Sequence, residues 1–594
     1  MFKKVLIANR GEIAVRIAKA CRELRIPSIA IYSDPDAKSL HVRAADEARA
    51  LGGAAPAENY LNIQKILAVA KKSGADAVHP GFGFLSENAK FAEACAQAGL
   101  KFIGPAPDAI RKMGDKIGAK QFLKPHGIPV IPGVEKPVSD AKEAKTIADQ
   151  IGYPVLVKAA AGGGGKGMRV VRKAEDLASS LEGAQREAKG AFGDDRVFIE
   201  KYIEGPRHIE IQVVADEHGN VIHLFERECS LQRRHQKVIE ETPSVAVDPK
   251  LREEMGATAV KIAKLIGYTN IGTMEFILDC AGEHEVRPYY FLEVNTRLQV
   301  EHPITEMVTG VDLVKTQIKI AAGLPLTRSL SPISGNSPLP VPGEGSGVRV
   351  RGHAIEARIY AEDPENNFLP SIGTITRLRE PRGEGVRVDS GIYEGWTIPI
   401  EYDPMLAKLI VHAPSRSQAT VKMLRALAGY EIGGVKTNIP FLMDLLRHPT
   451  FTEGRTETSV IERHFKDWLP GESEPEDPFS PWTAANHWRP GGNAQGSTDA
   501  QRRSVMAERK KEYLASHRPH GGAAGGDASA PMPGTVRKVL VKEGQKVAAG
   551  DPVLVIEAMK MEHTIDAPKD GIVKKIHYNV GDKVGMGEKL VELS

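Results

Sequence analysis

Cysteine is scarce in this sequence, with four among 594 residues: Cys21, Cys95, Cys229 and Cys280. They have neither the paired spacing of a zinc site nor the density of a disulfide framework, which predicts a reducing, cytoplasmic environment. Long apolar runs are also missing, because no stretch approaches the ~20 residues of a membrane-spanning helix. The uninterrupted apolar run before Asn9 is only four residues long (5–8), so we expect neither a signal peptide nor membrane association.

An excess of charge of either sign is absent as well. The chain has 79 basic and 76 acidic residues, which gives a net charge of +3. This balance argues against a nucleic-acid-binding surface or a polybasic membrane surface. The length predicts about three to five domains, each large enough for its own core.

The first turn of the chain lacks the Gly-x-Gly-x-x-Gly pattern of a dinucleotide-binding loop. It has instead an apolar strand over residues 5–8, a turn at Gly11, and a helix with one apolar face. Apolar strands then alternate with helical patterns as far as Gly104. This alternation predicts a parallel α/β sheet at the N-terminus.

A glycine run over residues 162–167 lies between two strand-like segments, 153–158 and 168–171. Such a run is either a flexible linker or a loop whose backbone N–H groups close over phosphate. We favour phosphate binding, because lysines lie inside the turn and apolar strands adjoin it on both sides. It is not a Walker loop, since no Gly-Lys-Ser/Thr opens a helix.

Two acidic strands follow, 273–276 and 291–295. Alternation places Glu293 and Asn295 on the same face of their strand, and Glu275 lies in the other strand. Carboxylate and amide oxygens are the ligands that Mg²⁺ takes when it bridges nucleotide phosphates, although either glutamate alone would be read as a surface residue. A basic cluster over residues 232–237 is either a solvated charge run or, beside a nucleotide, a site for a small oxyanion.

Near the C-terminus, residues 553–556 and 563–566 are predicted to form an antiparallel hairpin whose turn carries Lys560. The flanking sequence repeats without gaps, which predicts a small β-barrel of two equivalent halves. An isolated turn lysine is usually only exposed, but the repeat and the flanking methionines favour a covalent swinging arm. The repeated positions are Gly534, Val536, Lys538, Gly544, Lys546, Val547 and Gly550, which recur as Gly571, Val573, Lys575, Gly581, Lys583, Val584 and Gly587.

The turn Ala558-Met559-Lys560-Met561 resembles that of the biotin carboxyl carrier domain, in which the lysine carries biotin. Lipoyl domains share the fold but usually have Asp before the lysine, so lipoate is the weaker alternative. The glycine-rich hairpin is similar to the ATP-grasp arrangement, in which ATP lies between two α+β halves. Residues 1 to about 460 resemble biotin carboxylase, through the motifs at 7–12, 83–88, 162–167, 232–237 and 295–302 and through Arg358.

This resemblance implies site residues, position by position. The implied ATP-binding residues are Lys116, Lys158, Gly162, Gly163, Gly164, Gly165, Lys166, Gly167, Met168, Glu200, Lys201, Ile203, His208, Gln232, His235, Glu275 and Glu293. The implied bicarbonate and biotin site comprises Lys237, Arg297, Gln299, Val300, Glu301 and Arg358, with Lys237, Arg297, Glu301 and Arg358 as the catalytic residues. Glu301 would be the general base and Arg358 the cation facing biotin, while Glu275, Glu293 and Asn295 would hold Mg²⁺ or Mn²⁺.

The expected architecture is multidomain α/β and α+β. We predict an N-terminal α/β domain (1–112), an ATP-grasp domain (113–325), a biotin carboxylase C-terminal cap (348–464) and an all-β biotinyl barrel (528–594). Residues 465–527 read as a tether with one helix over 498–517, a possible docking element. Extra residues around 283–288 and the Pro/Gly-rich stretch 330–347 depart from the family pattern in loops.

The resemblance implies ATP- and bicarbonate-dependent carboxylation of biotin on Lys560, as part of an acyl-CoA carboxylase acting on acetyl-CoA or propionyl-CoA. Its partners would be a biotin protein ligase and a separate carboxyltransferase (beta) subunit, in a hetero-oligomeric complex with further copies of this chain. The alternatives are another ATP-grasp ligase, a carboxylating subunit for a 2-oxo acid such as pyruvate, or a catalytically silent carrier. The presence of Lys237, Glu301 and Arg358 disfavours the silent carrier.

Overall fold

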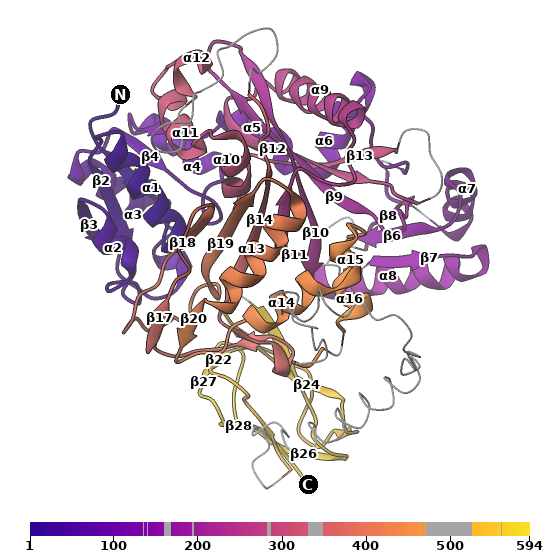
Figure 1. Ribbon diagram of the computed structural model, residues 1–594. Helices are drawn as coiled ribbons and strands as arrows, with labels where there is room; N and C mark the ends of the chain where they lie inside the picture. The colour runs from indigo at the N-terminus through magenta and orange to yellow at the C-terminus, as the bar shows by residue number, and fades with distance from the viewer. Residues whose placement is uncertain are drawn as a thin grey trace, which may run out of the picture.

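The computed structural model divides into four parts along the chain, which Figure 1 colours from indigo to yellow. It describes residues 1–134, 136–138, 140–159, 168–192, 195–281, 287–330, 348–466, 468–470, 526–559 and 561–594. The loop 160–167, the stretch 331–347, the helix expected over 498–517 and Lys560 lie outside the described residues. Within the described part of the chain, no helix is long and apolar enough to cross a membrane.

The N-terminal part is the predicted parallel α/β sheet, with strand order β3-β2-β1-β4-β5. Helix α1 presents Ile13 and Ile17 to the core, as the apolar spacing predicted. Helix α3 begins after Asn62, whose side chain accepts a hydrogen bond from the Lys65 N–H, and it ends at Gly74 in the left-handed conformation. The elements are β1 (Val5–Ile7), α1 (Gly11–Glu23), β2 (Ser28–Tyr32), α2 (Leu40–Ala44), β3 (Glu47–Ala50), α3 (Ile63–Ser73), β4 (Ala77–His79), α4 (Ala89–Gln97) and β5 (Lys101–Phe102).

The predicted glycine hairpin is present in its two arms, because β6 and β7 pair antiparallel on either side of residues 160–167. Strand β8 pairs with the other edge of β6, and helices α7 and α8 pack against this small sheet around a shared apolar core. The elements are α5 (Pro107–Gly114), α6 (Lys116–Leu123), α7 (Ala141–Ile151), β6 (Val155–Ala159), β7 (Met168–Val171), α8 (Leu177–Phe192) and β8 (Val197–Lys201).

An eight-stranded sheet forms the centre of the molecule, with order β13-β12-β9-β10-β11-β14-β19-β18. Its strands come from both the ATP-grasp part and the C-terminal part, because β11 pairs antiparallel with β14. All nine residues of β9 are buried. The strands are β9 (Arg207–Ala215), β10 (Val221–Arg233), β11 (Gln236–Thr242), β12 (Asn270–Leu278), β13 (Tyr289–Asn295), β14 (His353–Tyr360), β18 (Val386–Ser390) and β19 (Met405–Ala413).

Helices cover this sheet, and the C-terminal part adds a core of its own. In that core, Phe441 of α14 packs edge-on against Phe465 and Trp468. The helices are α9 (Pro249–Leu265), α10 (His302–Thr309), α11 (Leu313–Ala321), α12 (Leu326–Ser329), α13 (Arg416–Ala428), α14 (Ile439–Arg447), α15 (Pro449–Thr452) and α16 (Val460–His464). Short strands complete the region: β15 (Glu362–Asp363), β16 (Leu369–Pro370), β17 (Arg377–Arg379) and β20 (Glu431–Gly433).

The C-terminal barrel has the two equivalent halves that the repeat predicted. It consists of two four-stranded sheets, β21-β28-β26-β23 and β25-β24-β22-β27. Each half lends one short strand to the other, since β23 pairs with β26 and β27 pairs with β22. The strands are β21 (Ala528–Ser529), β22 (Gly534–Val539), β23 (Lys546–Val547), β24 (Pro552–Ala558), β25 (Met561–Asp566), β26 (Gly571–Ile576), β27 (Lys583–Val584) and β28 (Lys589–Leu593).

The expected hairpin is β24–β25, whose pairing ends at Ala558 and Met561. Two residues, Met559 and Lys560, therefore connect the strands. Met559 has a φ of +48°, the left-handed backbone that tight two-residue hairpin turns require.

Candidate active site

The Lys237 ammonium is the centre of the polar site. The side chain lies on β11, is only 13% exposed, and donates to Glu210 Oε2 at 2.6 Å, Glu275 Oε1 at 2.9 Å and Glu301 Oε1 at 2.7 Å. These carboxylates come from β9, from β12 and from the residue before α10. Four segments of chain thus place one cation among three acids on the central sheet.

Glu301 links this centre to Arg358. Its other oxygen, Oε2, accepts from Arg358 Nη2 at 3.0 Å, and Arg358 Nε donates to Glu240 Oε1 at 2.6 Å. Glu301 and Glu240 are fully buried. The pairing of β11 with β14 explains this contact, because it sets Glu240 opposite Glu356, two residues from Arg358. The predicted general base and the predicted biotin-facing cation are therefore in direct contact.

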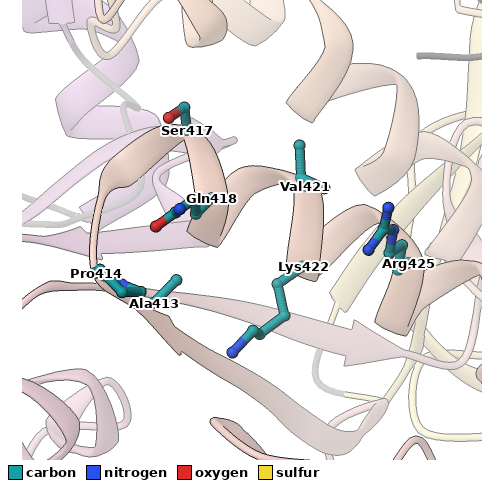
Figure 2. A pocket seen from close by; sticks show the side chains of 7 residues that line it. All are labelled: Ala413, Pro414, Ser417, Gln418, Val421, Lys422 and Arg425. Carbon is teal, nitrogen blue, oxygen red and sulfur yellow. The ribbon is translucent and has the colours of Figure 1, made fainter. Parts of the chain in front are cut away.

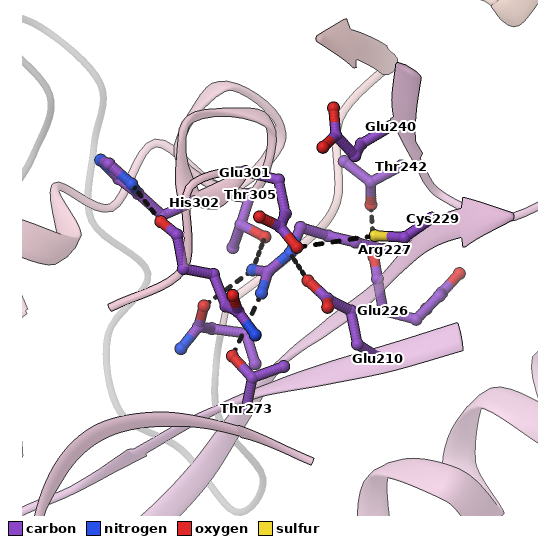
Figure 3. A network of polar contacts seen from close by, with 12 residues as sticks. Glu210, Glu226, Arg227, Cys229, Glu240, Thr242, Thr273, Glu301, His302 and Thr305 are labelled. Atoms are coloured by element: carbon purple, nitrogen blue, oxygen red, sulfur yellow. Dashed lines mark hydrogen bonds and ion pairs between the residues drawn. The ribbon is translucent and has the colours of Figure 1, made fainter. Parts of the chain in front are cut away.

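Arg227 contacts one of these acids, Glu210, as Figure 3 shows. Its guanidinium is fully buried and donates from Nε to Glu210 Oε1. Its Nη1 and Nη2 donate to the hydroxyl groups of Thr305 at 2.9 Å and Thr273 at 3.2 Å. All three guanidinium nitrogens donate a hydrogen bond, as burial of a charge requires. Arg227 can therefore hold the Glu210 carboxylate in position to accept from Lys237.

Arg297 organises the predicted bicarbonate side. It donates to Gln299 Oε1 at 2.8 Å, to Asn295 Oδ1 at 3.0 Å and to Glu87 Oε2 at 2.8 Å. Gln299 in turn donates to Glu275 Oε1 at 3.2 Å, which joins this group to the Lys237 centre. A guanidinium, an amide and an ammonium side by side supply the donors that a small planar oxyanion needs.

Val300 adjoins this group through its backbone. Its carbonyl accepts from Lys408 Nζ at 2.9 Å, and Lys408 is fully buried.

The predicted nucleotide residues His208, Gln232 and Glu275 also lie together. Gln232 Nε2 lies 3.0 Å from His208 Nδ1, and His208 Nε2 lies 2.9 Å from Glu275 Oε2. His235 is exposed at the turn between β10 and β11, with a φ of +64°.

The predicted metal ligands lie at the edge of the same sheet. Glu275 and Glu293 are directly paired across β12 and β13, and Asn295 pairs with Thr273, so all three side chains share one region. Carboxylate and amide oxygens fit Mg²⁺ or Mn²⁺. Among the described residues, a compact group of His208, Glu210 and Glu275 could also hold a metal ion. Sequence reasoning had assigned His208 to the nucleotide and had not considered Glu210.

A second polar group lies on the glycine hairpin. Lys158 on β6 is ion-paired with Glu200 on β8, and Lys120 on α6 reaches the same carboxylate at 3.2 Å. The Lys201 ammonium instead donates to backbone carbonyls of Gly152 at 2.9 Å and Tyr153 at 3.1 Å. Two lysines and one acid therefore adjoin the predicted phosphate loop, apart from the acids that surround Lys237.

Three other predicted nucleotide residues complete this region. Ile203 is buried and Met168 is exposed on β7, while the side chain of Lys116 lies outside the described residues.

The electrostatics of the centre follow from burial and from the mixture of charges. Burial would raise the pKa of Glu301, but Lys237 and Arg358 outweigh it and hold that pKa well below the ordinary value. Burial raises the pKa of Glu240 to about 7 despite Arg358. Burial also raises the pKa of Glu210, which Arg227 and Lys237 only partly offset. Glu301 is therefore ionised at neutral pH, while Glu240 is near its titration midpoint.

Comparison with known proteins places all four parts of the chain. Residues 1–110 match the model for the biotin carboxylase N-terminal domain, and 115–329 match the ATP-binding domain of the carbamoyl-phosphate synthase L chain. Residues 356–463 match the biotin carboxylase C-terminal domain, and 527–593 match the model described as biotin-requiring enzyme.

Relatives match over most of the chain. A pyruvate carboxylase subunit of Methanothermobacter thermautotrophicus is 52% identical over 464 residues, which covers 78% of this chain and 90% of that protein. The alpha subunit of mitochondrial methylcrotonoyl-CoA carboxylase of Mus musculus is 40% identical over 665 residues, covering 96% of this chain and 90% of that one. The chain belongs to the biotin-dependent carboxylases.

A solved structure agrees with this assignment. The biotin carboxylase domain of the Hydrogenobacter thermophilus 2-oxoglutarate carboxylase, in complex with MgADP, ADP and bicarbonate, superposes with a TM-score of 0.70 at 48% identity. The match covers 79% of this chain and 98% of that one. The chain is thus a biotin carboxylase, an ATP-dependent ligase, fused to a biotinyl carrier barrel. The predicted fold class is confirmed in each of its four parts.

Several residues of the carboxylase centre were missed by sequence reasoning, namely Glu210, Arg227, Glu240, Lys120 and Glu87. A signal for Glu210 was present, because His208, Glu210 and Gln212 alternate along a strand whose other residues after Arg207 are apolar. Three polar residues on one face of a buried strand indicate a polar interior. No comparable pattern marks Arg227, whose partner Glu210 lies opposite it on the neighbouring strand β9. None marks Lys120 either, whose partner Glu200 lies 80 residues along the chain.

A surface pocket of the carboxylase lies away from this centre, along α13, and Figure 2 shows it. Lys422 within it donates to the backbone carbonyls of His412 at 2.8 Å and Glu384 at 3.0 Å. The lining residues are Ala413, Pro414, Ser417, Gln418, Val421, Lys422 and Arg425. None of them was a predicted site residue, and none belongs to the Lys237 centre.

Proposed function

We propose that this chain is the biotin carboxylase and carrier subunit of an acyl-CoA carboxylase, whose carboxyltransferase is a separate subunit. The observation that carries the proposal is the match to the alpha subunit of methylcrotonoyl-CoA carboxylase over 96% of the chain. That match includes carboxylase and carrier together, in one polypeptide. The partner would take the carboxyl group from biotin on Lys560 to an acyl-CoA, with acetyl-CoA and propionyl-CoA as the acceptors expected from sequence.

The chemistry that we propose for the centre follows from its charges. Bicarbonate would bind between Arg297, Gln299, Lys237 and the Val300 backbone, beside ATP. Glu301 would accept the bicarbonate proton as a bicarbonate oxygen attacks the γ-phosphorus of ATP, with release of ADP. In the structure, the Glu301 carboxylate accepts hydrogen bonds from Lys237 and Arg358. A bicarbonate anion that binds to Lys237 would weaken the hold of this ammonium on Glu301 and so raise the Glu301 pKa. A higher pKa makes the carboxylate a better base.

The remaining groups would stabilise charge. Lys158, together with Lys116 and the loop 162–167, would neutralise the phosphates, a role that needs donors placed before reaction begins. Mg²⁺ or Mn²⁺ on Glu275, Glu293 and Asn295 would add positive charge beside the transferred phosphoryl group. Carboxyphosphate would then break down to CO₂ and phosphate, and the phosphate would take the ureido N–H proton of biotin on Lys560. The deprotonated ureido nitrogen would form the new N–C bond to CO₂. Arg358, which keeps its charge at any ordinary pH, would stabilise negative charge on the ureido ring.

A second candidate is the carboxylating subunit of a 2-oxo acid carboxylase. Identity to the pyruvate carboxylase relative is higher, at 52%, but it spans only 78% of this chain. The alternative that the chain is a catalytically silent carrier is disfavoured by the contacts that join Lys237, Glu301 and Arg358. Cytoplasmic location, a biotin protein ligase as partner and assembly into a hetero-oligomer stay predictions.

An acceptor panel tests the proposal. The chain would be purified from its native source with its bound partner and given ATP, Mg²⁺ and labelled bicarbonate. Acetyl-CoA, propionyl-CoA, methylcrotonoyl-CoA, pyruvate and 2-oxoglutarate would be offered separately. Acid-stable label on a CoA thioester is the expected result. Label only on a 2-oxo acid would overturn the acyl-CoA assignment and favour the second candidate.

A further inference from the structure

Met559, at the tip of the carrier hairpin, is buried although its position in a two-residue turn would be expected to face water. Its side chain is 1% exposed. It belongs to an apolar cluster whose other buried members all come from the carboxylase C-terminal part. We call these residues the Met559 seat: Ala361, Ile375, Ile392, Trp396, Ile398 and Leu406. Figure 1 shows the yellow barrel lying against that orange part of the molecule.

Two further contacts hold the barrel in this place, and a histidine of the hairpin is buried. The Met559 N–H donates to the Ile400 carbonyl at 3.2 Å, which adds a backbone bond beside the seat. Leu369 of the carboxylase packs against the apolar core of the barrel. His563 on β25 is buried, and burial together with Arg234 and Arg233 lowers its pKa to about 4.

The Met559 seat lies next to the carboxylation centre. Ala361 follows Arg358 by three residues at the end of β14, about 10 Å along an extended chain. Its neighbour Glu362 accepts from Arg233 at 2.7 Å through both oxygens, which ties the seat to the β10–β11 turn. Lys237 lies at the other end of that turn, as the second residue of β11. The seat is thus joined to the strands that carry Arg358 and Lys237, through β14 and through the Arg233–Glu362 pair.

The backbone of Met559 indicates that its side chain is required. A φ of +48° is unfavourable for a residue with a side chain, and two-residue turns of this kind usually contain Gly, Asn or Asp. A methionine that occupies such a position gains its stabilisation elsewhere. Its long flexible thioether suits an irregular apolar site such as the seat.

We infer that Met559 is the positioning residue of the carrier, and that its insertion into the Met559 seat holds the β24–β25 hairpin against the carboxylase while the attached biotin is carboxylated. The inference concerns the first half-reaction only. It depends on the biotin carboxylase activity of the family and not on which acceptor the partner subunit uses.

Matched variants of the full chain separate the side chain from the turn. Met559→Gly removes the seat contact while relieving the positive φ, and Met559→Leu keeps an apolar side chain of similar size. Met586→Ala is the control, because Met586 belongs to the same barrel but is 74% exposed. All chains would be compared per attached biotin, counted by avidin gel shift, so that incomplete biotinylation does not enter the result.

Two rates and one structural readout decide the inference. Met559→Gly should carboxylate its attached biotin about 10- to 100-fold more slowly in a single turnover with labelled bicarbonate, the factor expected when one large apolar side chain leaves a buried site. Met559→Leu should recover most of that rate, and Met586→Ala should match the wild type. With free biotin as substrate, kcat for ATP cleavage should be the same in all four chains. Hydrogen exchange over 552–566 should speed up in Met559→Gly alone.

Contrary outcomes are equally definite. Wild-type carboxylation of attached biotin by Met559→Gly would overturn the inference, because the turn backbone would then suffice. Equal loss of free-biotin turnover in that variant would also overturn it, since the residue would then act on the fold and not on carrier placement. Unchanged hydrogen exchange in Met559→Gly would show that the hairpin is not held by this side chain.

Discussion

At the scale of single residues, the carboxylase centre depends on charge compensation around Lys237. One ammonium contacts Glu210, Glu275 and Glu301, and Arg358 contacts the last of these. Burying this many charges is favourable only when each has partners. Burial is the main reason why Glu210 and Glu240 have raised pKa values, and the neighbouring Glu301 carboxylate adds to it. Lys237 and Arg358 outweigh burial at Glu301 and lower its pKa.

Glu301→Gln tests the base at this scale. We expect biotin-dependent ATP cleavage to fall by roughly 10²-fold or more, the usual contribution of a general base. The fold should survive, because Gln is nearly isosteric and the remaining acids Glu210 and Glu240 can take more negative charge once Glu301 is neutral. Steady-state rates with free biotin, measured with a melting curve, give the answer. Turnover within a few-fold of wild type would remove Glu301 from the proposed chemistry.

Lys560→Arg tests the attachment site. Arginine keeps the charge and approximate length of lysine but has no primary amine that can form an amide with biotin. An avidin blot of the variant, expressed with an active biotin protein ligase, should be blank. Lys538→Arg, on strand β22 of the same barrel, is the control and should blot like wild type. A signal from the Lys560→Arg chain would place the biotin on another lysine.

At the scale of elements, the sequence predicted best the helices, strands and turns that are determined by residues close together in the chain. The arms of the glycine hairpin, the β24–β25 turn and the apolar face of α1 were all predicted from local periodicity, and the structure confirms them. The sequence did not predict that β11 and β14 pair, which joins the ATP-grasp and C-terminal parts into one sheet. No local pattern specifies a partner more than a hundred residues away.

This limit explains which site residues were found. Glu301 and Arg358 were identified from motifs, but their direct contact could not be predicted, nor the bond from Arg358 to Glu240 across β14 and β11. The pair of Arg227 and Glu210 was missed because it depends on the register between β10 and β9. The other partners of Arg227, Thr273 and Thr305, lie farther along the chain. The burial of Met559 was missed for a similar reason, since its environment belongs to another part of the molecule.

The contact between α1 and β19 leads to a prediction on pH. Glu12 on α1 is buried 3.3 Å from Lys408 Nζ on β19. Burial raises its pKa from 4.5 to about 7, although Lys408 acts in the opposite direction. The folded state therefore binds more protons than the unfolded state between those values. The free energy of unfolding should therefore fall by about 3 kcal/mol at most as the pH rises from 4.5 to 7, and this contribution should stay level above pH 7.

Glu12→Gln should remove this dependence. The melting temperature of the variant minus that of wild type should be more positive at about pH 8 than at about pH 5, on either side of the raised pKa. Glu253→Gln, an exposed change on α9, is the control and should show no such trend. If the difference between variant and wild type were the same at both pH values, the Glu12 carboxyl would not titrate in this range.

At the scale of the whole molecule, carboxylase and carrier form one working unit. The barrel lies against the C-terminal part of the carboxylase, with Met559 in an apolar cluster of that part. The composition of residues 465–527 predicts a tether of ~60 residues, which if flexible would span roughly 40–45 Å root-mean-square. Such a tether would let the same barrel leave the Met559 seat and visit a second site.

The four matched parts leave little of the chain for a second active site. A site for an acyl-CoA needs a large pocket and groups that stabilise an oxyanion, normally in a domain of ~50–200 residues with its own core. The matched parts account for carboxylation and carriage, and the composition of residues 465–527 reads mostly as a tether. The purified chain with ATP, Mg²⁺ and labelled bicarbonate should therefore label its own biotin but no acyl-CoA. Adding a carboxyltransferase subunit should restore transfer to propionyl-CoA or another acceptor. Acid-stable labelled methylmalonyl-CoA formed by the chain alone would reveal a transferase site within these 594 residues.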